Sequence, residues 1–242
     1  MNDHQLNQFS RQILLDGWGI EAQQRVINSR VLIVGAGGLG HGLSQHLVRA
    51  GVSITLVDPD RVDLSNLSRQ WFSADDVGRP KVEAAARLLS GLGSVDAQVL
   101  AFDDNNAGRF SDHDLWIDAS DNLATRLCMH HAARRHRLPW IMGTALMWSG
   151  QCAAFAPGAP CFECVFGHIR EPAQQCDTSG VLGPVVNQVA TTQALWALSY
   201  LGAVAALPVG RLRRWDGPHG DVMDLSFTHR EHCDCRSSAH NP

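Results

Sequence analysis

The chain has 242 residues, of which 45% are apolar and 18% are charged, and its formal net charge is −4. These values predict a large globular domain with a substantial core, and they argue against an intrinsically disordered chain. The slight negative charge also argues against nucleic acid as a partner, because nucleic-acid-binding proteins carry a basic excess. No uninterrupted apolar run reaches about 18 residues, so we expect no membrane-spanning helix.

The predicted elements alternate between helix and strand in the first part of the chain. Residues 1–30 are expected to form a helical entry segment. Strands are predicted at 31–34, 54–57, 97–102 and 114–118, and helices at 39–49, 81–92 and 126–137. This alternation predicts an α/β fold with a Rossmann-like, doubly wound and mostly parallel sheet.

The pattern changes after Trp140. Strands are predicted at 140–145, 151–155, 211–216 and 222–227, which together indicate a C-terminal antiparallel extension of the sheet. The interval 156–180 is rich in Pro, Gly and Cys and is expected to be a loop. The apolar stretch 181–207 is broken by polar residues, so it is predicted to be a buried helix.

A glycine-rich turn follows the first predicted strand and precedes a helix. Its G-x-G-x-x-G pattern contains Gly35, Gly37, Gly38 and Gly40. Such a turn brings backbone N–H groups and a helix N-terminus against a phosphate. Asp58 ends the next strand, where a carboxylate can bind ribose hydroxyls. The sequence therefore predicts a nucleotide site, although the pattern does not distinguish NAD, FAD and ATP.

A group of polar residues follows the second strand. Basic residues beside a phosphate favour phosphoryl or adenylyl transfer over hydride transfer, because charge builds on phosphate oxygens in that transition state. Ordinary surface charges in a solvated loop are the alternative interpretation. The residues of this group are Asp58, Asp60, Ser65, Asn66, Arg69, Gln70 and Lys81.

Asp121 and Asn122 follow the predicted strand 114–118 at the carboxyl edge of the sheet. An Asp at this edge can hold Mg²⁺ against bound phosphates, because that ion prefers hard oxygen ligands. The alternative is that these residues cap the helix that follows, since Asp and Asn are common at helix N-termini.

The cysteines indicate a reducing compartment and a metal site. No signal peptide is predicted from residues 1–12, so the seven cysteines are expected to be thiols in a cytoplasmic protein. Cys161 and Cys164 form one close pair, and Cys233 and Cys235 form another, so a structural zinc clip is predicted. His232 could replace Cys233 as a ligand. A redox C-x-x-C pair is less favoured, because Cys161 is not expected to open a helix after a strand.

Cys176 lies in a polar loop before the long predicted helix and has no cysteine nearby. A thiol near a helix N-terminus has a lowered pKa and is a better nucleophile. An inert free cysteine is the alternative.

In this order the motifs resemble the ThiF/MoeB/HesA family, the bacterial relatives of ubiquitin-activating enzymes. The similarity runs from Phe9 to Cys235. It is strongest at residues 10–16, 65–70 and 180–186, the glycine turn and Asp121-Asn122. The opening and the segment around Cys176 are most similar to ThiF-type members.

The resemblance implies ATP-dependent adenylation of a small ubiquitin-like sulfur-carrier protein ending in Gly-Gly, for thiamine or molybdopterin biosynthesis. It implies a homodimer in which Arg11 enters the neighbouring active site, and a covalent role for Cys176. It also implies a separate sulfur-donor protein. The single domain 1–242 would then comprise the entry segment 1–30, a nucleotide-binding half at 31–145, and a carrier-binding and zinc half at 146–242. The implied cofactors are ATP, Mg²⁺ and Zn²⁺, with phosphate contacts from Gly38, Asn66, Arg69 and Lys81.

Other functions remain open from the sequence. The chain departs from the family's spacing at the C-x-C pair, and Asn187-Gln188 and Ala190 stand where relatives often carry small residues, including glycines. A nicotinamide-dependent oxidoreductase would use the same glycine turn and Asp58. A relative that adenylates a carboxylate on tRNA is less favoured, because the chain lacks a basic excess. A binding protein that keeps the fold without catalysis is the last alternative.

Overall fold

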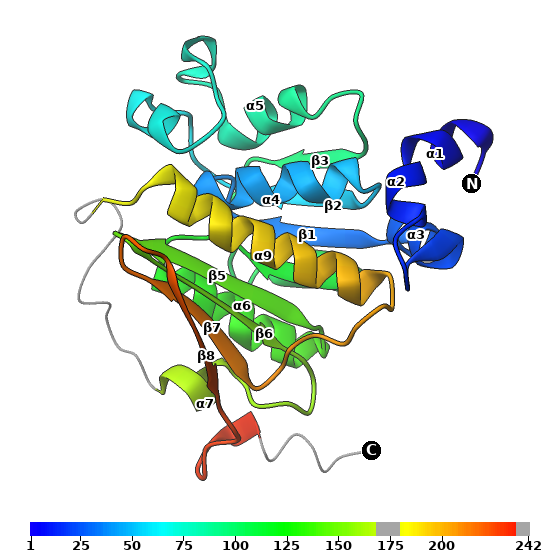
Figure 1. Ribbon diagram of the computed structural model, residues 1–242. Helices are drawn as coiled ribbons and strands as arrows, with labels where there is room; N and C mark the ends of the chain where they lie inside the picture. The colour runs from blue at the N-terminus through cyan, green and yellow to red at the C-terminus, as the bar shows by residue number, and fades with distance from the viewer. Residues whose placement is uncertain (168–179, 236–242) are drawn as a thin grey trace.

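The computed structural model of the protein describes residues 1–167 and 180–235 (Figure 1). One sheet runs through the described residues in the order β3-β2-β1-β4-β5-β6-β7-β8. Strands β1 to β5 are parallel, and β6, β7 and β8 continue the sheet in antiparallel pairs. The predicted α/β class and its antiparallel extension are therefore confirmed. The strands are β1 (Arg30–Val34), β2 (Ser53–Val57), β3 (Val95–Gln98), β4 (Leu115–Asp118), β5 (Trp140–Leu146), β6 (Ser149–Phe155), β7 (Arg211–Asp216) and β8 (Asp221–Ser226).

Helices cover both faces of this sheet. In Figure 1, α4 and α9 lie side by side in front of the strands, and α6 lies behind them. The α-helices are α1 (Asp3–Gln8), α2 (Ser10–Ile13), α3 (Gly19–Asn28), α4 (Gly38–Arg49), α5 (Lys81–Leu88), α6 (Leu123–His136), α7 (Phe162–Phe166) and α9 (Gly183–Leu201). Short 3-10 turns are η1 (Leu64–Ser68), η2 (Ala74–Asp76) and η3 (Ala107–Phe110).

Alternate residues of the central strands enter two separate cores. Val31 and Ile33 of β1 pack with α4, α5 and α9, whereas Leu32 and Val34 pack with α6 and η3. A strand that is buried on both faces needs apolar side chains at consecutive positions, which is why β1 has the sequence RVLIV. This double burial fixes the strand ends that carry the polar residues.

Three boundaries differ from the sequence expectations. The third strand is Val95–Gln98 rather than 97–102. Helix α5 ends at Leu88 instead of 92, because the chain turns through Gly91, whose φ is +81°. The interval 156–180 is not wholly loop, since α7 forms within it. Residues 168–179 lie outside the described part of the chain.

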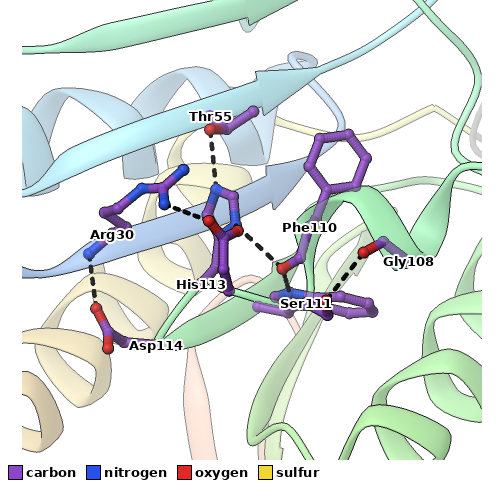
Figure 2. Close-up of polar contacts among 9 residues, drawn as sticks. Arg30, Thr55, Gly108, Phe110, Ser111, His113 and Asp114 are labelled. Carbon is purple, nitrogen blue, oxygen red and sulfur yellow. Dashed lines mark hydrogen bonds and ion pairs between the residues drawn. The ribbon is translucent and has the colours of Figure 1, made fainter.

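A buried histidine joins the strands at the edge of the sheet opposite their carboxyl ends. His113 Nε2 lies 2.9 Å from Thr55 Oγ1, and His113 Nδ1 lies 3.0 Å from the Phe110 carbonyl oxygen (Figure 2). The backbone N–H of Arg30 donates to Asp114 nearby. Both ring nitrogens of this histidine thus have partners, as expected for a buried polar side chain with a structural role.

Helix α9 is long and largely apolar, and it is buried along one side against α4 and β5. Among the helices of the described residues, none is long and apolar enough to cross a membrane. The hydrophobicity of α9 is therefore explained by packing on the sheet. A buried helix is predicted for 181–207, and α9 occupies only Gly183–Leu201 of that stretch.

Candidate active site

The glycine turn joins β1 to α4 at the carboxyl edge of the sheet. Gly35 has a φ of +104°, and an added Cβ there would lie 2.5 Å from the Ala119 carbonyl oxygen. A Cβ on Gly40 would lie 1.8 Å from the Gly35 carbonyl oxygen, so α4 can approach the turn only without a side chain at that position. These close contacts explain the first and last glycines of the pattern. The helix N-terminus is left facing outward for a ligand.

A cavity of about 440 Å³ opens beside this turn. It lies where the strand order reverses between β1 and β4, which is the usual ligand position in such sheets. Most of the predicted site residues line it. They are Gly35, Gly37, Gly38, Asp58, Asp60, Asn66, Arg69, Gln70, Lys81, Asp121 and Asn122.

Asp58 immediately follows β2 and holds the glycine turn. Its Oδ2 accepts a hydrogen bond from the Ala36 N–H at 2.7 Å, and its Oδ1 accepts from the Asp60 N–H at 2.8 Å. Burial raises the pKa of Asp58, and these two hydrogen bonds and Lys81 oppose that rise. Each carboxylate oxygen can accept a further hydrogen bond, so Asp58 can also bind ribose hydroxyls.

The cations are held at the cavity wall by short local contacts. Lys81 begins α5, is almost buried, and its Nζ lies 2.8 Å from Asp60 Oδ2. Arg69 follows η1, and its Nη1 donates to the Ser65 carbonyl oxygen at 3.0 Å. Asn66 is buried, and its Oδ1 accepts from the Asp63 N–H at 3.0 Å. Asn66 therefore shapes the loop that carries Arg69.

Two features of the cavity bear on the ligand that it can bind. Gln70 is buried, and its Oε1 has no hydrogen-bond partner although it lines the cavity. A buried acceptor of this kind is normally satisfied, so it marks a position for a donor. Among the lining residues, carboxylates also outnumber cations. The carboxylates are Asp58, Asp60, Asp63 and Asp121, and the cations are Arg61, Arg69 and Lys81.

A buried ion pair supports the loop that carries Asp121. Asp118 Oδ2 accepts from Arg126 Nε at 2.5 Å, and Arg126 Nη2 also donates to the Ser120 carbonyl oxygen at 3.0 Å. Gln193 of α9 donates to the Asp118 carbonyl oxygen at 2.8 Å. These supporting residues were not predicted, because only the strand order brings Gln193 to β4. The D-x-x-x-x-x-x-x-R spacing of Asp118 and Arg126 gave no recognisable signal.

The alternative of a helix cap is confirmed for Asn122. Its Oδ1 accepts from the Thr125 N–H at 2.8 Å at the start of α6. Asp121 is exposed at the cavity instead. Asn122 therefore has the structural position, and Asp121 has the position that faces a ligand.

Several predicted site residues lie elsewhere. Gly40 packs against the turn and Ser65 donates to Asp63, so neither lines the cavity. Arg11 is exposed on α2, which lies near the amino end of β1, far from the cavity of its own chain (Figure 1). Cys176 lies outside the described residues.

His41 provides a test of the loop that follows Arg69. Its Nδ1 accepts from the Trp71 N–H at 3.1 Å, its ring stacks on Phe72, and burial lowers its pKa from 6.5 to about 4. In the unfolded chain His41 binds a proton near pH 6.5, whereas in the folded chain it does so only near pH 4. The free energy of unfolding should therefore decrease as the pH is lowered from 6.5 to 4. The full loss is about 3 kcal/mol. His41→Asn keeps an acceptor for Trp71 and should remove this part of the pH dependence in urea titrations.

Other buried histidines also contribute to the pH dependence of the free energy of unfolding. The difference between wild type and His41→Asn therefore gives the contribution of His41 alone. The pKa of His113 is likewise lowered by burial. His113→Asn should therefore leave the His41 share in place and serves as the matched variant. An identical pH slope in wild type and His41→Asn would show that the pKa of His41 is the same in the folded and the unfolded chain.

The predicted cysteine cluster forms where α7 meets the segment that follows β8. Cys161 Sγ lies 3.8 Å from Cys164 Sγ and 3.5 Å from Cys233 Sγ, and Cys164 Sγ lies 3.4 Å from Cys235 Sγ. Zinc bonds of about 2.3 Å in a tetrahedron place sulfurs about 3.8 Å apart, so this donor set fits a tetrahedral ion. Cys233, rather than the exposed His232, is the member that joins the group.

One argument about the C-x-x-C pair was wrong. Cys161 does open a helix after a strand, because it immediately precedes α7 and the Cys164 N–H donates to its carbonyl oxygen at 3.0 Å. The redox alternative is nevertheless not favoured, since the thiols of both pairs meet. A further donor is the Arg230 N–H, which lies 3.4 Å from Cys164 Sγ.

Comparison with known proteins decides the family. The ThiF family profile matches residues 9–237. The chain belongs to the ThiF family. Its relatives include the sulfur carrier protein ThiS adenylyltransferase of Escherichia coli strain K12, 36% identical over 96% of each chain. The SAMP-activating enzyme E1 of Haloferax volcanii is 37% identical over 96% of this chain and 88% of its own. The molybdopterin-synthase adenylyltransferase of Escherichia coli strain K12 is 32% identical over 97% of each.

Solved structures share the fold of this ThiF-family chain. Escherichia coli MccB superposes with a TM-score of 0.83 at 22% identity, covering 95% of this chain and 72% of MccB. The structure of MccB with ATP gives a TM-score of 0.81 at 22% identity, covering 95% of this chain and 74% of MccB. These matches extend the shared architecture through the antiparallel strands.

Proposed function

We propose that this protein uses ATP to adenylate the C-terminal glycine carboxylate of a small ubiquitin-like sulfur-carrier protein ending in Gly-Gly. One observation carries the proposal. The glycine turn, Asp58, Arg69, Lys81 and Asp121 all line one cavity. Cations at this position favour adenylyl transfer over hydride transfer. The names of the relatives, which include adenylyltransferases and a SAMP-activating enzyme, support the same reaction.

Each part of the cavity has a task in this reaction. The N-terminus of α4 and the glycine turn bind phosphate oxygens, and Asp58 binds the ribose. The carrier carboxylate attacks the α-phosphorus, and pyrophosphate leaves with the electrons of the broken P–O bond. Arg69 and Lys81 offset the charge that develops. Asp121 is the residue placed to hold Mg²⁺, which would neutralise phosphate charge when bound.

The second half of the chain has separate tasks in the proposal. Residues 146–242 form the carrier-binding and zinc half, and Cys161, Cys164, Cys233 and Cys235 hold a structural Zn²⁺. Metal at this position would tie the turn after β6 to the segment after β8, since one pair of ligands comes from each. We place the protein in the cytoplasm, where cysteines stay reduced and available to a metal, and a separate donor protein supplies the sulfur.

We place Arg11 in the active site of a partner copy. The cavity of one chain carries more carboxylates than cations, so a triphosphate needs additional positive charge. Mixing Arg11→Ala with Lys81→Ala should then regenerate activity from two inactive proteins. In a two-fold symmetric dimer, random pairing restores about a quarter of the sites. Pyrophosphate exchange after denaturation and refolding of the mixture measures this, and no recovery would contradict a shared site.

Cys176 is proposed to act after adenylation. As a nucleophile it would attack the acyl carbon of the carrier adenylate and release AMP. Cys176→Ala should leave pyrophosphate exchange unchanged and slow formation of the carrier thiocarboxylate, measured by mass spectrometry with the sulfur donor present. Cys128→Ala is the control, because Cys128 lies on α6 away from the cavity. An unchanged transfer rate would remove the assigned role.

Exchange of labelled pyrophosphate into ATP tests the proposed function directly. The purified protein should catalyse exchange only with Mg²⁺ and a carrier that ends in Gly-Gly, and removal of the last glycine should abolish it. Small Gly-Gly-ending proteins from the same cell are the substrates to try. Tight NADH binding without ATP binding, or no exchange with any of these carriers, would contradict the proposal.

A further inference from the structure

One buried histidine lacks the partners that the other has. His113 is bonded through both ring nitrogens (Figure 2), whereas His130 makes no hydrogen bond at Nδ1 or Nε2 and has no exposed surface. The Glu163 carboxylate lies near His130, with its Oε2 3.7 Å from Nε2, which is beyond hydrogen-bond distance. Leaving a buried donor unsatisfied costs stability, so such a group normally has a partner in the functional state of a protein. The question is which partner His130 acquires.

The surroundings of His130 point to the cysteine cluster. His130 projects from α6, and its ring packs beside Trp140 and Phe162, with centroids 6.2 and 5.8 Å away. Ligand atoms of His130, Cys161 and Glu163 lie within 4.8 Å of one another. A cavity of about 210 Å³ is lined by both His130 and Cys161.

Metal binding changes what the sulfur can accept. A cysteine that binds a metal is a thiolate, which accepts hydrogen bonds more strongly than a thiol. Outer donors of this kind orient metal ligands and strengthen metal binding. The ring N–H of His130 makes no hydrogen bond, and a ring nitrogen of His130 lies within 4.8 Å of Cys161 Sγ, so His130 can serve as such a donor and Cys161 as its acceptor.

We propose that His130 is a positioning residue for the cysteine metal centre, donating its ring N–H to the Cys161 thiolate formed when the metal binds. This inference rests on the proposed zinc site. It does not make His130 a ligand, because the four cysteines already complete a tetrahedral set. It predicts that His130 matters for holding the metal and not for the stability of the metal-free chain.

The experiment compares metal release with stability. His130→Phe keeps an aromatic ring packed beside Trp140 and Phe162 but removes the N–H. Zinc release to a colorimetric chelator should become about 10- to 100-fold faster, whereas the stability of the metal-free chain should stay equal or rise. His131→Asn is the matched control, because His131 is an exposed histidine on the same helix. Its release rate should equal that of wild type.

Two further measurements separate the alternatives. Substitution with Co²⁺ should give the same four-sulfur absorption spectrum in wild type and His130→Phe, with one metal per chain in both. A changed spectrum or a second wild-type metal would make His130 a ligand and overturn the proposal. Glu163→Met removes the carboxylate that lies 3.7 Å from His130 Nε2 and should retain wild-type release, since faster release there would identify Glu163 as the acceptor. An unchanged rate in His130→Phe would also overturn it.

A wild-type chain that purifies without metal would overturn both the zinc site and this inference. Pyrophosphate exchange would then still test the adenylation separately, because the cysteine cluster and the nucleotide cavity share no lining residue among those described. Failure of the metal centre and failure of the enzymatic proposal are therefore distinguishable.

Discussion

Replacing Asp121 by Asn should lower the rate of pyrophosphate exchange by about 10²- to 10³-fold, the scale of losing one charged contact to a transition state. Asp121 is exposed at the cavity while its neighbour Asn122 caps α6. The substitution therefore removes a ligand oxygen charge without disturbing the helix start. Exchange at a series of Mg²⁺ concentrations is the measurement, and the variant should need more Mg²⁺ than wild type.

Two comparisons make the Asp121 result specific. Binding of ATP in the presence of a metal chelator should be nearly unchanged in Asp121→Asn, because the residue is proposed to act through Mg²⁺. Asp221→Asn is the control, since Asp221 is an exposed aspartate on β8. Equal exchange rates in Asp121→Asn and wild type would exclude Asp121 from the reaction.

Replacing Arg126 by Met should lower the free energy of unfolding by about 3–5 kcal/mol, because it leaves a buried charge without its partner. The Asp118 side chain has no exposed surface, and Arg126 also donates to the carbonyl oxygens of Ser120 and Gly143. Urea denaturation measures the change. Exchange activity should fall as well, since Ser120 precedes Asp121 in the loop.

Arg135→Met provides the comparison within the same helix. Arg135 pairs with Asp104, but both side chains are more than half exposed, so the loss should be below about 1 kcal/mol. Adding Asp118→Asn to Arg126→Met should recover part of the stability, because the uncompensated charge is removed. If Arg126→Met costs no more than Arg135→Met, the buried pair does not support the loop.

Much of the fold could be predicted because its signals are local. The RVLIV run predicts a strand buried on both faces, and the glycines after it predict the turn into α4. The same reasoning placed Asp58, Lys81 and Asp121 at strand and helix ends, where the sheet brings them to one cavity. Residues near the carboxyl ends of parallel strands meet whatever loops intervene.

The residues that sequence reasoning missed act through contacts between distant segments. Gln193 reaches Asp118 across 75 positions, and His41 holds the Trp71 amide from a different element. His130 lies on a helix whose apolar pattern gives no sign that its ring approaches Cys161. Such partners depend on how helices pack on the sheet, and neither periodicity nor motif spacing encodes that arrangement.

The hydrogen bond between Asp58 and the Ala36 N–H has a consequence for how nucleotide affinity is achieved. The Asp58 carboxylate, which follows the adjacent strand β2, holds the loop in its receiving shape through a hydrogen bond within the protein itself. Ligand entry then costs little backbone conformational entropy, because rigid receptors lose less freedom on association. No binding energy is then spent on ordering a flexible loop. That energy stays available for straining and aligning the reacting phosphate.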